Sequence, residues 1–171
     1  MLTIDEGRKI AADYLRQLSD DLELYNNPIH EGCYGWVFAF QSRKFIQTGH
    51  FSDQLAGNAP LLLDRHTEKL HALGTADTVE FYVKNYVEFG DPFKRPGRFV
   101  EVSSCREGAD KASAIREIRQ YSEIGLTDAK VAIDKCLSGE RQVIECRTLA
   151  DAEHLVSNLS ELGISAAQLG E

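Results

Sequence analysis

The chain has 171 residues, a length that allows one or two domains. Hydrophobic residues make up 43% and charged residues 27%, the balance of a globular protein rather than a disordered one. The formal net charge is −8, and residues 1–95 and 96–171 each carry −4. Because nucleic acid and anionic membranes attract basic surfaces, this acidity argues against both as partners.

The N-terminal stretch Met1–Lys9 is charged where a signal peptide has its apolar core. The longest apolar run, Tyr34–Phe40, is far shorter than the ~20 residues that cross a bilayer. We therefore expect a cytoplasmic protein. The four cysteines include no Cys-x-x-Cys pair. Their even number permits disulfides, but without an export signal they are expected to be free thiols that fill apolar gaps.

Apolar periodicity predicts a helix and two hairpins in the first part of the chain. Residues 4–18 carry apolar side chains at helical spacing. Aromatic and β-branched runs at 34–40 and 45–48 predict one hairpin, and the runs at 60–64 and 69–73 predict a second.

Two capping signals mark helix starts: Thr3 with Glu6, and Asp77 with Glu80. The second signal opens an amphipathic helix with one apolar side, made of Val79, Tyr82, Val83, Tyr86 and Val87. The first half is therefore predicted to be an α+β unit, an antiparallel sheet with two helices on one of its faces.

A proline- and glycine-rich stretch at residues 90–97 holds two of the four prolines of the chain. Proline cannot donate a ladder hydrogen bond and restricts the residue before it, so this stretch predicts a domain boundary. We expect a first domain over 1–90, a linker over 91–97 and a second domain over 98–171.

The second half predicts the order β-α-α-β-α-β. Strands are predicted over 99–102, 142–146 and 164–169, and helices after Asp110, Leu126 and Thr148. Gly163 stands where a left-handed helix C-cap belongs. Both halves together predict the α+β class.

Several motifs follow one another in fixed order in the first half. They are Gly35-Trp36-Val37-Phe38, Gly57-Asn58-Ala59-Pro60 and the run from Pro60 to Leu70. In this order they resemble the immunity protein 35 family of bacterial polymorphic toxin systems. The resemblance implies a small cytoplasmic domain that binds and neutralises a toxin encoded beside it, without enzymatic activity. The chain departs from the family at Glu68, where the family has Gly, which predicts a differently shaped turn.

The second half carries Ile124–Lys130, Asp151-Ala152-Glu153 and Gly163. This pattern resembles the C-terminal domain of the ribosomal stalk protein, which has the ClpS-like fold. The resemblance implies a docking face for a translation factor or a protease component. Carried over residue by residue, that face is Lys111, Arg116, Gly125, Leu126 and Lys130. Glu117, Tyr121 and Glu123 add acid and bulk beside it, and the dimerisation segment of the stalk protein is absent.

Three residues have side chains that could take part in catalysis or metal binding. Cys33, near His30, has the residue type of a thiol nucleophile, but it precedes a predicted strand rather than a helix. His66 and His71 flank a hairpin turn, and two ligands without a third do not make a zinc site. Trp36 is expected in the core. We therefore expect no catalytic residue, no metal site and no cofactor.

These observations favour a non-enzymatic immunity protein whose partner is a cognate toxin. The alternative is an adaptor or translation-associated binding protein that acts through the second domain. An enzyme built on Cys33 is the third possibility.

Overall fold

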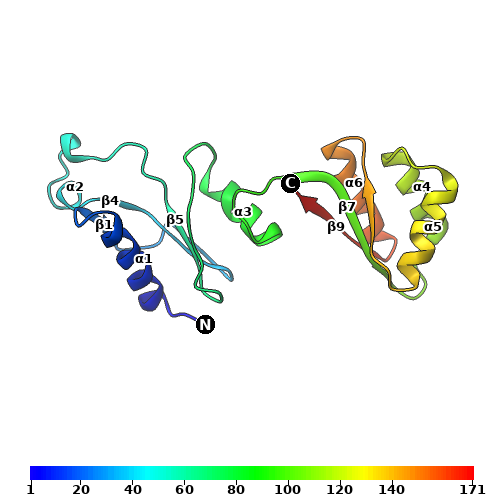
Figure 1. The fold of residues 1–171 in the computed structure, drawn as a ribbon, viewed down its shortest axis with the longest axis horizontal. Coiled ribbons are helices and arrows are strands. Elements are labelled where there is room, and N and C mark those ends of the chain that lie inside the picture. Colours follow the sequence, from blue (N-terminus) through cyan, green and yellow to red (C-terminus); the bar gives the residue numbers. More distant parts are fainter. The chain divides into compact units, whose positions relative to one another are not determined.

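The computed structural model describes residues 1–171 and divides into two compact units, Met1–Phe93 (unit 1) and Lys94–Glu171 (unit 2) (Figure 1). Unit 1 has eight Lys and Arg residues against fourteen Asp and Glu residues, a net charge of −6, and unit 2 carries the remaining −2. No helix of either unit combines the length and the apolarity needed to cross a membrane. Pro96 and Gly97, placed in the predicted linker, are the first residues of a strand.

Unit 1 consists of α1 (Ile4–Leu18), β1 (Leu22–Leu24), β2 (His30–Gly32), β3 (Gly35–Phe38), β4 (Phe40–Ser42), α2 (Arg43–Thr48), the 3₁₀ turn η1 (Phe51–Asp53), β5 (Leu61–Asp64), β6 (Leu70–Ala72) and α3 (Val79–Phe89). Strands β1 and β4 form a two-stranded sheet, and the other strands form a four-stranded sheet in the order β2-β3-β5-β6. All of these pairs are antiparallel.

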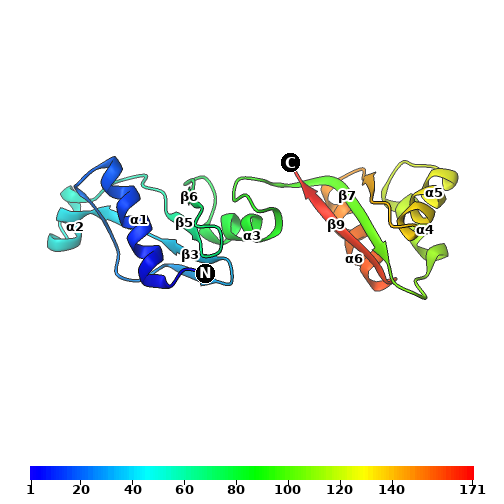
Figure 2. The ribbon, with the colours of Figure 1, turned by 60° about the horizontal axis from the view of Figure 1, so that its bottom comes forward.

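Helices α1 and α3 cover opposite faces of the four-stranded sheet (Figure 2). Side chains alternate between the two faces of a strand. Trp36 and Leu63 accordingly pack with α1, whereas Val37 and Leu62 pack with α3. The expectation that both helices share one face was wrong. Because both faces are covered, all four residues of β3 and all four of β5 are buried.

The first predicted hairpin was wrong, because residues 43–48 form helix α2 instead of a strand. The Ser42 hydroxyl accepts a hydrogen bond from the Phe45 amide at 3.0 Å and so caps the helix. Gly49 ends it in the left-handed conformation, with φ of 67°. These local capping interactions prevail over the β propensity of Phe45 and Ile46.

The second predicted hairpin is confirmed, with Leu61 opposite Ala72 and Leu63 opposite Leu70. The capping box of Thr3 and Glu6 is present at the start of α1. At α3 the cap is Thr78 rather than Asp77.

Unit 2 has the predicted element order: β7 (Pro96–Cys105), α4 (Lys111–Tyr121), α5 (Leu126–Leu137), β8 (Gln142–Glu145), α6 (Leu149–Glu161) and β9 (Ile164–Gly170). The antiparallel sheet has the order β8-β7-β9. Val100 and Ile144 of the sheet share one core with Ile118, Ile133 and Leu159 of the three helices. Gly163 adopts the predicted left-handed conformation, with φ of 81°. The α+β class is thus confirmed.

Candidate functional site

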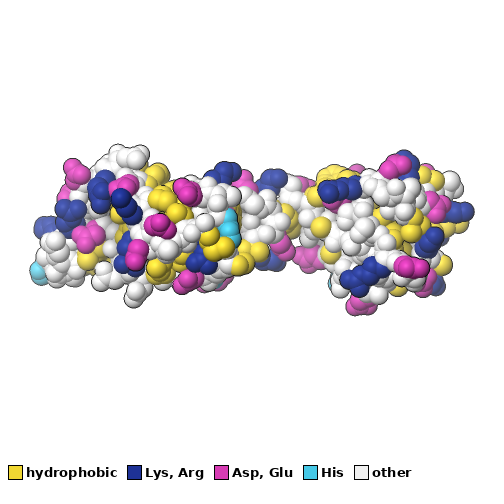
Figure 3. All heavy atoms as spheres, turned by 90° about the horizontal axis from the view of Figure 1, so that it is seen from below, with side chains coloured by type: hydrophobic (Ala, Val, Ile, Leu, Met, Phe, Trp, Pro, Cys, Tyr) yellow, Lys and Arg dark blue, Asp and Glu magenta, His cyan; other side chains and the backbone are white.

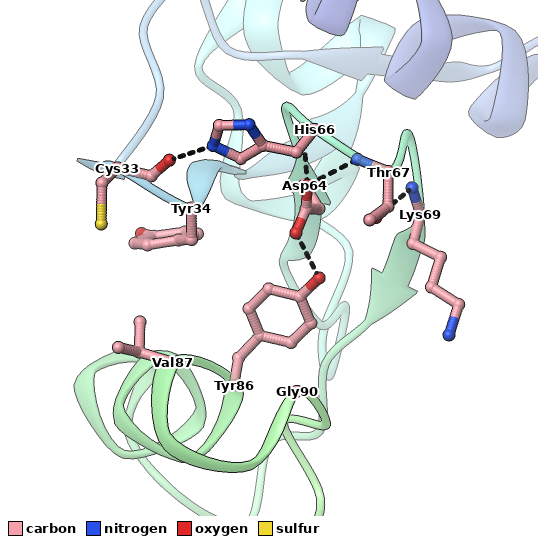
Figure 4. A pocket seen from close by; sticks show the side chains of 9 residues that line it. All are labelled: Cys33, Tyr34, Asp64, His66, Thr67, Lys69, Tyr86, Val87 and Gly90. Atoms are coloured by element: carbon pink, nitrogen blue, oxygen red, sulfur yellow. Dashed lines mark hydrogen bonds between the residues drawn. The ribbon is translucent and has the colours of Figure 1, made fainter. Parts of the chain in front are cut away.

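A pocket of about 490 Å³ opens in unit 1 between the β5–β6 turn and helix α3 (Figure 4). Its volume lies within the range of roughly 300–1,000 Å³ that is usual for ligand-binding pockets. The lining comes from three separate parts of the chain: Cys33 and Tyr34 before β3; Asp64, His66, Thr67 and Lys69 at the turn; and Tyr86, Val87 and Gly90 at the end of α3. The fold, not the local sequence, therefore creates this site.

Asp64, the last residue of β5, lies at the centre of the polar side of the pocket and is only 8% exposed. Its Oδ1 accepts hydrogen bonds from the amides of His66 at 2.6 Å and Thr67 at 2.8 Å. Its Oδ2 accepts a hydrogen bond from the Tyr86 hydroxyl at 2.6 Å. One carboxylate thus fixes the turn and ties it to α3.

The hydrogen bonds keep this buried carboxyl ionised. Burial by itself raises the pKa of Asp64, but the bonds from Tyr86, Thr67 and His66 outweigh it and hold the pKa below its usual value. On the other side of the pair, burial and the hydrogen bond to the charged Asp64 raise the pKa of Tyr86 to about 12. Tyr86 therefore keeps its proton at neutral pH and acts as a donor.

The turn next to Asp64 has an unusual backbone. Glu68 has φ of 61°, in the left-handed region that favours glycine. The residue that departs from the immunity protein 35 pattern thus adopts the conformation that Gly favours, and the expected change of turn shape is not required. His66 Nε2 lies 2.9 Å from the carbonyl oxygen of Cys33, which connects the turn to the segment before β3.

The other walls of the pocket are apolar. The rings of Tyr34 and Tyr86 meet edge to face, with 6.3 Å between their centroids. Val87 lies across from Tyr34 in Figure 4 and is 57% exposed. The apolar side predicted for α3 is buried at Tyr82, Val83 and Tyr86, as expected, but not at Val87. The sequence places Val87 on the apolar side of α3, and only the structure shows that it stays exposed beside the pocket.

A second cluster supports the sheet from the α1 side. Trp36 is fully buried, as expected. Its Nε1 donates a hydrogen bond to Glu31 at 3.1 Å, and the guanidinium carbon of Arg65 lies 4.4 Å from its ring centroid. Gly35, directly before it, has φ of 143°. A Cβ atom there would lie 2.0 Å from the Leu63 carbonyl oxygen, so the strand pair tolerates only Gly. The motif Gly35-Trp36-Val37-Phe38 therefore specifies the sheet that carries the pocket.

Residues 5–86 match the family model described as Immunity protein 35. The match lies within unit 1 and includes α1, the four-stranded sheet and the pocket residues up to Tyr86. It supports the resemblance found from the motifs of the first half.

A stretch of 52 residues is 44% identical to "Uncharacterized protein YrhB" of Escherichia coli (strain K12) and covers 30% of this chain. The chain spans about half the length of that relative, 55%. No solved structure matches the chain. The Immunity protein 35 match ends at residue 86, and none of the comparisons supports the resemblance of residues 98–171 to the ribosomal stalk domain, which stays a prediction.

The predicted docking residues of unit 2 are only partly brought together. Gly125 is the N-cap of α5, Leu126 is its first residue, and Lys130 follows one turn later on the same side. Lys111 and Arg116 both lie on α4. Five residues at 3.6 per turn place them about 140° apart around that helix, so they do not share a face. Leu126 is 57% exposed.

The two histidines singled out in the sequence make contacts within unit 1. His66 contacts the Cys33 carbonyl oxygen, and the His71 ring packs against Tyr86 with 5.3 Å between centroids. Burial lowers the pKa of His71 below its usual value. On the face drawn in Figure 3, acidic and basic side chains are interspersed over each unit. The net charge is therefore not gathered into one acidic patch on that face.

Proposed function

We propose that the chain is a non-enzymatic immunity protein that binds a cognate toxin in the cytoplasm and neutralises it stoichiometrically. The observation that carries this proposal is the Immunity protein 35 match over residues 5–86. The match coincides with the unit that holds the pocket, so unit 1 is the part of the chain assigned to toxin binding.

Within unit 1 we assign the contact to the pocket between the turn and α3. Its apolar walls, Tyr34 and Val87, suit an apolar or aromatic side chain that projects from the toxin. The polar side is rigid, because Asp64 is held by three hydrogen bonds. A preformed pocket needs little ordering on binding, which favours affinity.

The charge of unit 1 supports the same partner class. A net charge of −6 attracts a basic toxin over distances of about one Debye length, roughly 8–10 Å at physiological salt. Such attraction speeds the encounter more than it tightens the complex. The association rate should therefore fall as salt is added, while the dissociation rate changes little.

A second candidate function is supported by Leu126. It is an apolar side chain, 57% exposed, and it is the first residue of α5, directly after the N-cap Gly125. Together with Lys130 it could dock a translation factor or a protease component. Lys111 and Arg116 lie on α4 without sharing one face of that helix, so this candidate surface is assigned to Leu126 and Lys130.

Two matched variants distinguish the two functions. Val87 and Leu126 are each 57% exposed, one in each unit, so Val87→Asp and Leu126→Asp introduce the same charge at equal exposure. In cells that express the toxin from the adjacent gene, the wild-type chain should restore growth and co-elute with the toxin on gel filtration.

The proposal predicts that Val87→Asp weakens the complex at least about 30-fold, whereas Leu126→Asp leaves it intact. The opposite pattern would assign binding to unit 2. The absence of both rescue and a complex with the wild-type chain would refute the immunity function.

A further inference from the structure

Two of the four cysteines, Cys105 and Cys136, lie in contact in unit 2. Cys105 is the last residue of β7, and Cys136 lies in the last turn of α5. Their Sγ atoms are 3.4 Å apart although 31 positions separate them in sequence. A disulfide has an S–S distance of about 2.05 Å, so the two sulfur atoms need to approach by only ~1.4 Å. The contact places them within reach of a covalent bond.

We propose that Cys105 and Cys136 form a reversible intramolecular disulfide, with a low-molecular-weight disulfide as the oxidant. The two thiols are not equivalent. Cys105 is partly exposed, whereas Cys136 is only 2% exposed. An oxidant from solution therefore reaches Cys105 first.

The chemistry follows from this difference in access. The Cys105 thiol loses its proton, and the thiolate attacks the external disulfide; a mixed disulfide forms at Cys105 and one small thiolate leaves. The Cys136 thiol then loses its proton and attacks the Cys105 sulfur, which forms the internal bond and releases the second small thiolate. Two protein thiols are oxidised, and one external disulfide is reduced to two thiols.

The order of the two steps is set by the environment of Cys136. Burial and the close contact with the Cys105 sulfur raise the pKa of Cys136 to about 12, so at neutral pH this thiol is a poor first nucleophile. In the second step it is already beside its target, and a well-oriented intramolecular attack gains a large effective concentration. Proximity thus offsets the low thiolate fraction.

The bond would tie the end of β7 to the last turn of α5. Helix α5 begins with Leu126, so the bond would fix at its far end the helix that presents this exposed side chain. It would also close a long loop, which restricts the unfolded chain and favours the folded form of unit 2.

The remaining cysteines serve as internal controls. Cys33 is exposed but belongs to unit 1, and Cys146 is 1% exposed just after β8.

The full chain is incubated with oxidised glutathione, free thiols are alkylated, and the peptides are mapped by mass spectrometry. We expect the wild-type chain to lose two hydrogen masses and to yield a linked Cys105–Cys136 peptide that a reductant separates.

Three variants test the mechanism. Cys105→Ser should abolish the internal bond, whereas Cys146→Ser should leave it unchanged. Cys136→Ala should trap glutathione on Cys105, since the second thiol is missing. In the wild-type chain, oxidation should shift the folding equilibrium of unit 2 toward the folded form by a factor on the order of 100.

The proposal is overturned if Cys105 and Cys136 both remain open to alkylation on unfolding after oxidation. It is equally overturned if the only products are glutathione on Cys33 or dimers linked between chains. None of these outcomes depends on toxin binding.

Discussion

Replacing Tyr86 with Phe removes one hydroxyl group and leaves the ring that packs against Val83 and Tyr34. The lost interaction is the 2.6 Å hydrogen bond to the ionised carboxylate of Asp64, and both side chains are 8% exposed. A hydrogen bond to a charged group contributes about 1.5–3 kcal/mol. Asp64 keeps its two backbone amide donors in the variant. We therefore expect the free energy of unfolding of unit 1 to fall by about 2 kcal/mol at neutral pH.

The same bond predicts a pH dependence with a definite sign. The pKa of Asp64 is lower in the folded chain than in the unfolded chain, so the unfolded state binds the proton more tightly. This contribution to stability is fully present above the unfolded pKa of about 3.9 and is lost as the pH falls through the lower folded value. Because Phe cannot stabilise the carboxylate, the stability of Tyr86→Phe should depend less on pH below about 4.

The stability of unit 1 can be measured from the fluorescence of its own tryptophan. Trp36 is the single tryptophan and is fully buried in unit 1, so its fluorescence during urea denaturation follows this unit. Asp64→Asn is the control, since an amide oxygen can still accept from the backbone but carries no charge. In the double variant Tyr86→Phe with Asp64→Asn, the loss in the free energy of unfolding should differ from the sum of the two single losses by at least about 1 kcal/mol. A change below about 0.5 kcal/mol for Tyr86→Phe, with an unaltered pH profile, would refute this account of the pocket.

Gly35→Ala should prevent unit 1 from folding, since the new Cβ would lie 2.0 Å from the Leu63 carbonyl oxygen. Gly49→Ala should reduce the free energy of unfolding by only about 1–2 kcal/mol, because Gly49 has φ of 67° and open space around it. Equal losses for the two variants in urea denaturation would contradict the steric argument. Glu68→Gly should raise the stability of unit 1 by up to about 1 kcal/mol, because φ of 61° strains Glu more than Gly. A lower urea midpoint for Glu68→Gly would show that its side chain contributes contacts that outweigh the strain.

Periodic apolar patterns and capping signals could be predicted from the sequence, because both depend on neighbours within one or two turns. The capping box at Thr3 and the left-handed Gly163 are of this kind. Strands β1 and β2 have three residues each, too few for an alternating pattern to stand out. Helix α2 was mistaken for a strand because Phe45 and Ile46 favour β structure on their own, and the caps at Ser42 and Gly49 reverse that preference.

Local sequence patterns also could not predict which face of the sheet each helix covers. Because both faces are buried, β3 and the first three residues of β5 are apolar, and such a run does not show which helix covers which face. The alternation of Trp36 and Val37 between α1 and α3 becomes visible only once both helices are in place.

The pocket itself depends on contacts between distant residues. Asp64 and Tyr86 are 22 positions apart, and His66 and Cys33 are 33 apart. Nothing in the spacing of these residues indicates that they meet. The pair Cys105 and Cys136 is hidden in the same way, because its contact depends on how α5 packs on β7.

The most direct test of the immunity function is a titration of toxin activity with the purified full chain, using the toxin encoded beside it. Stoichiometric binding predicts that activity falls in a straight line and reaches zero at one chain per toxin, without dependence on incubation time. Loss of activity at a small fraction of one equivalent, progressing with time, would reveal an enzyme. Undiminished activity at a large excess of the chain would contradict toxin binding altogether.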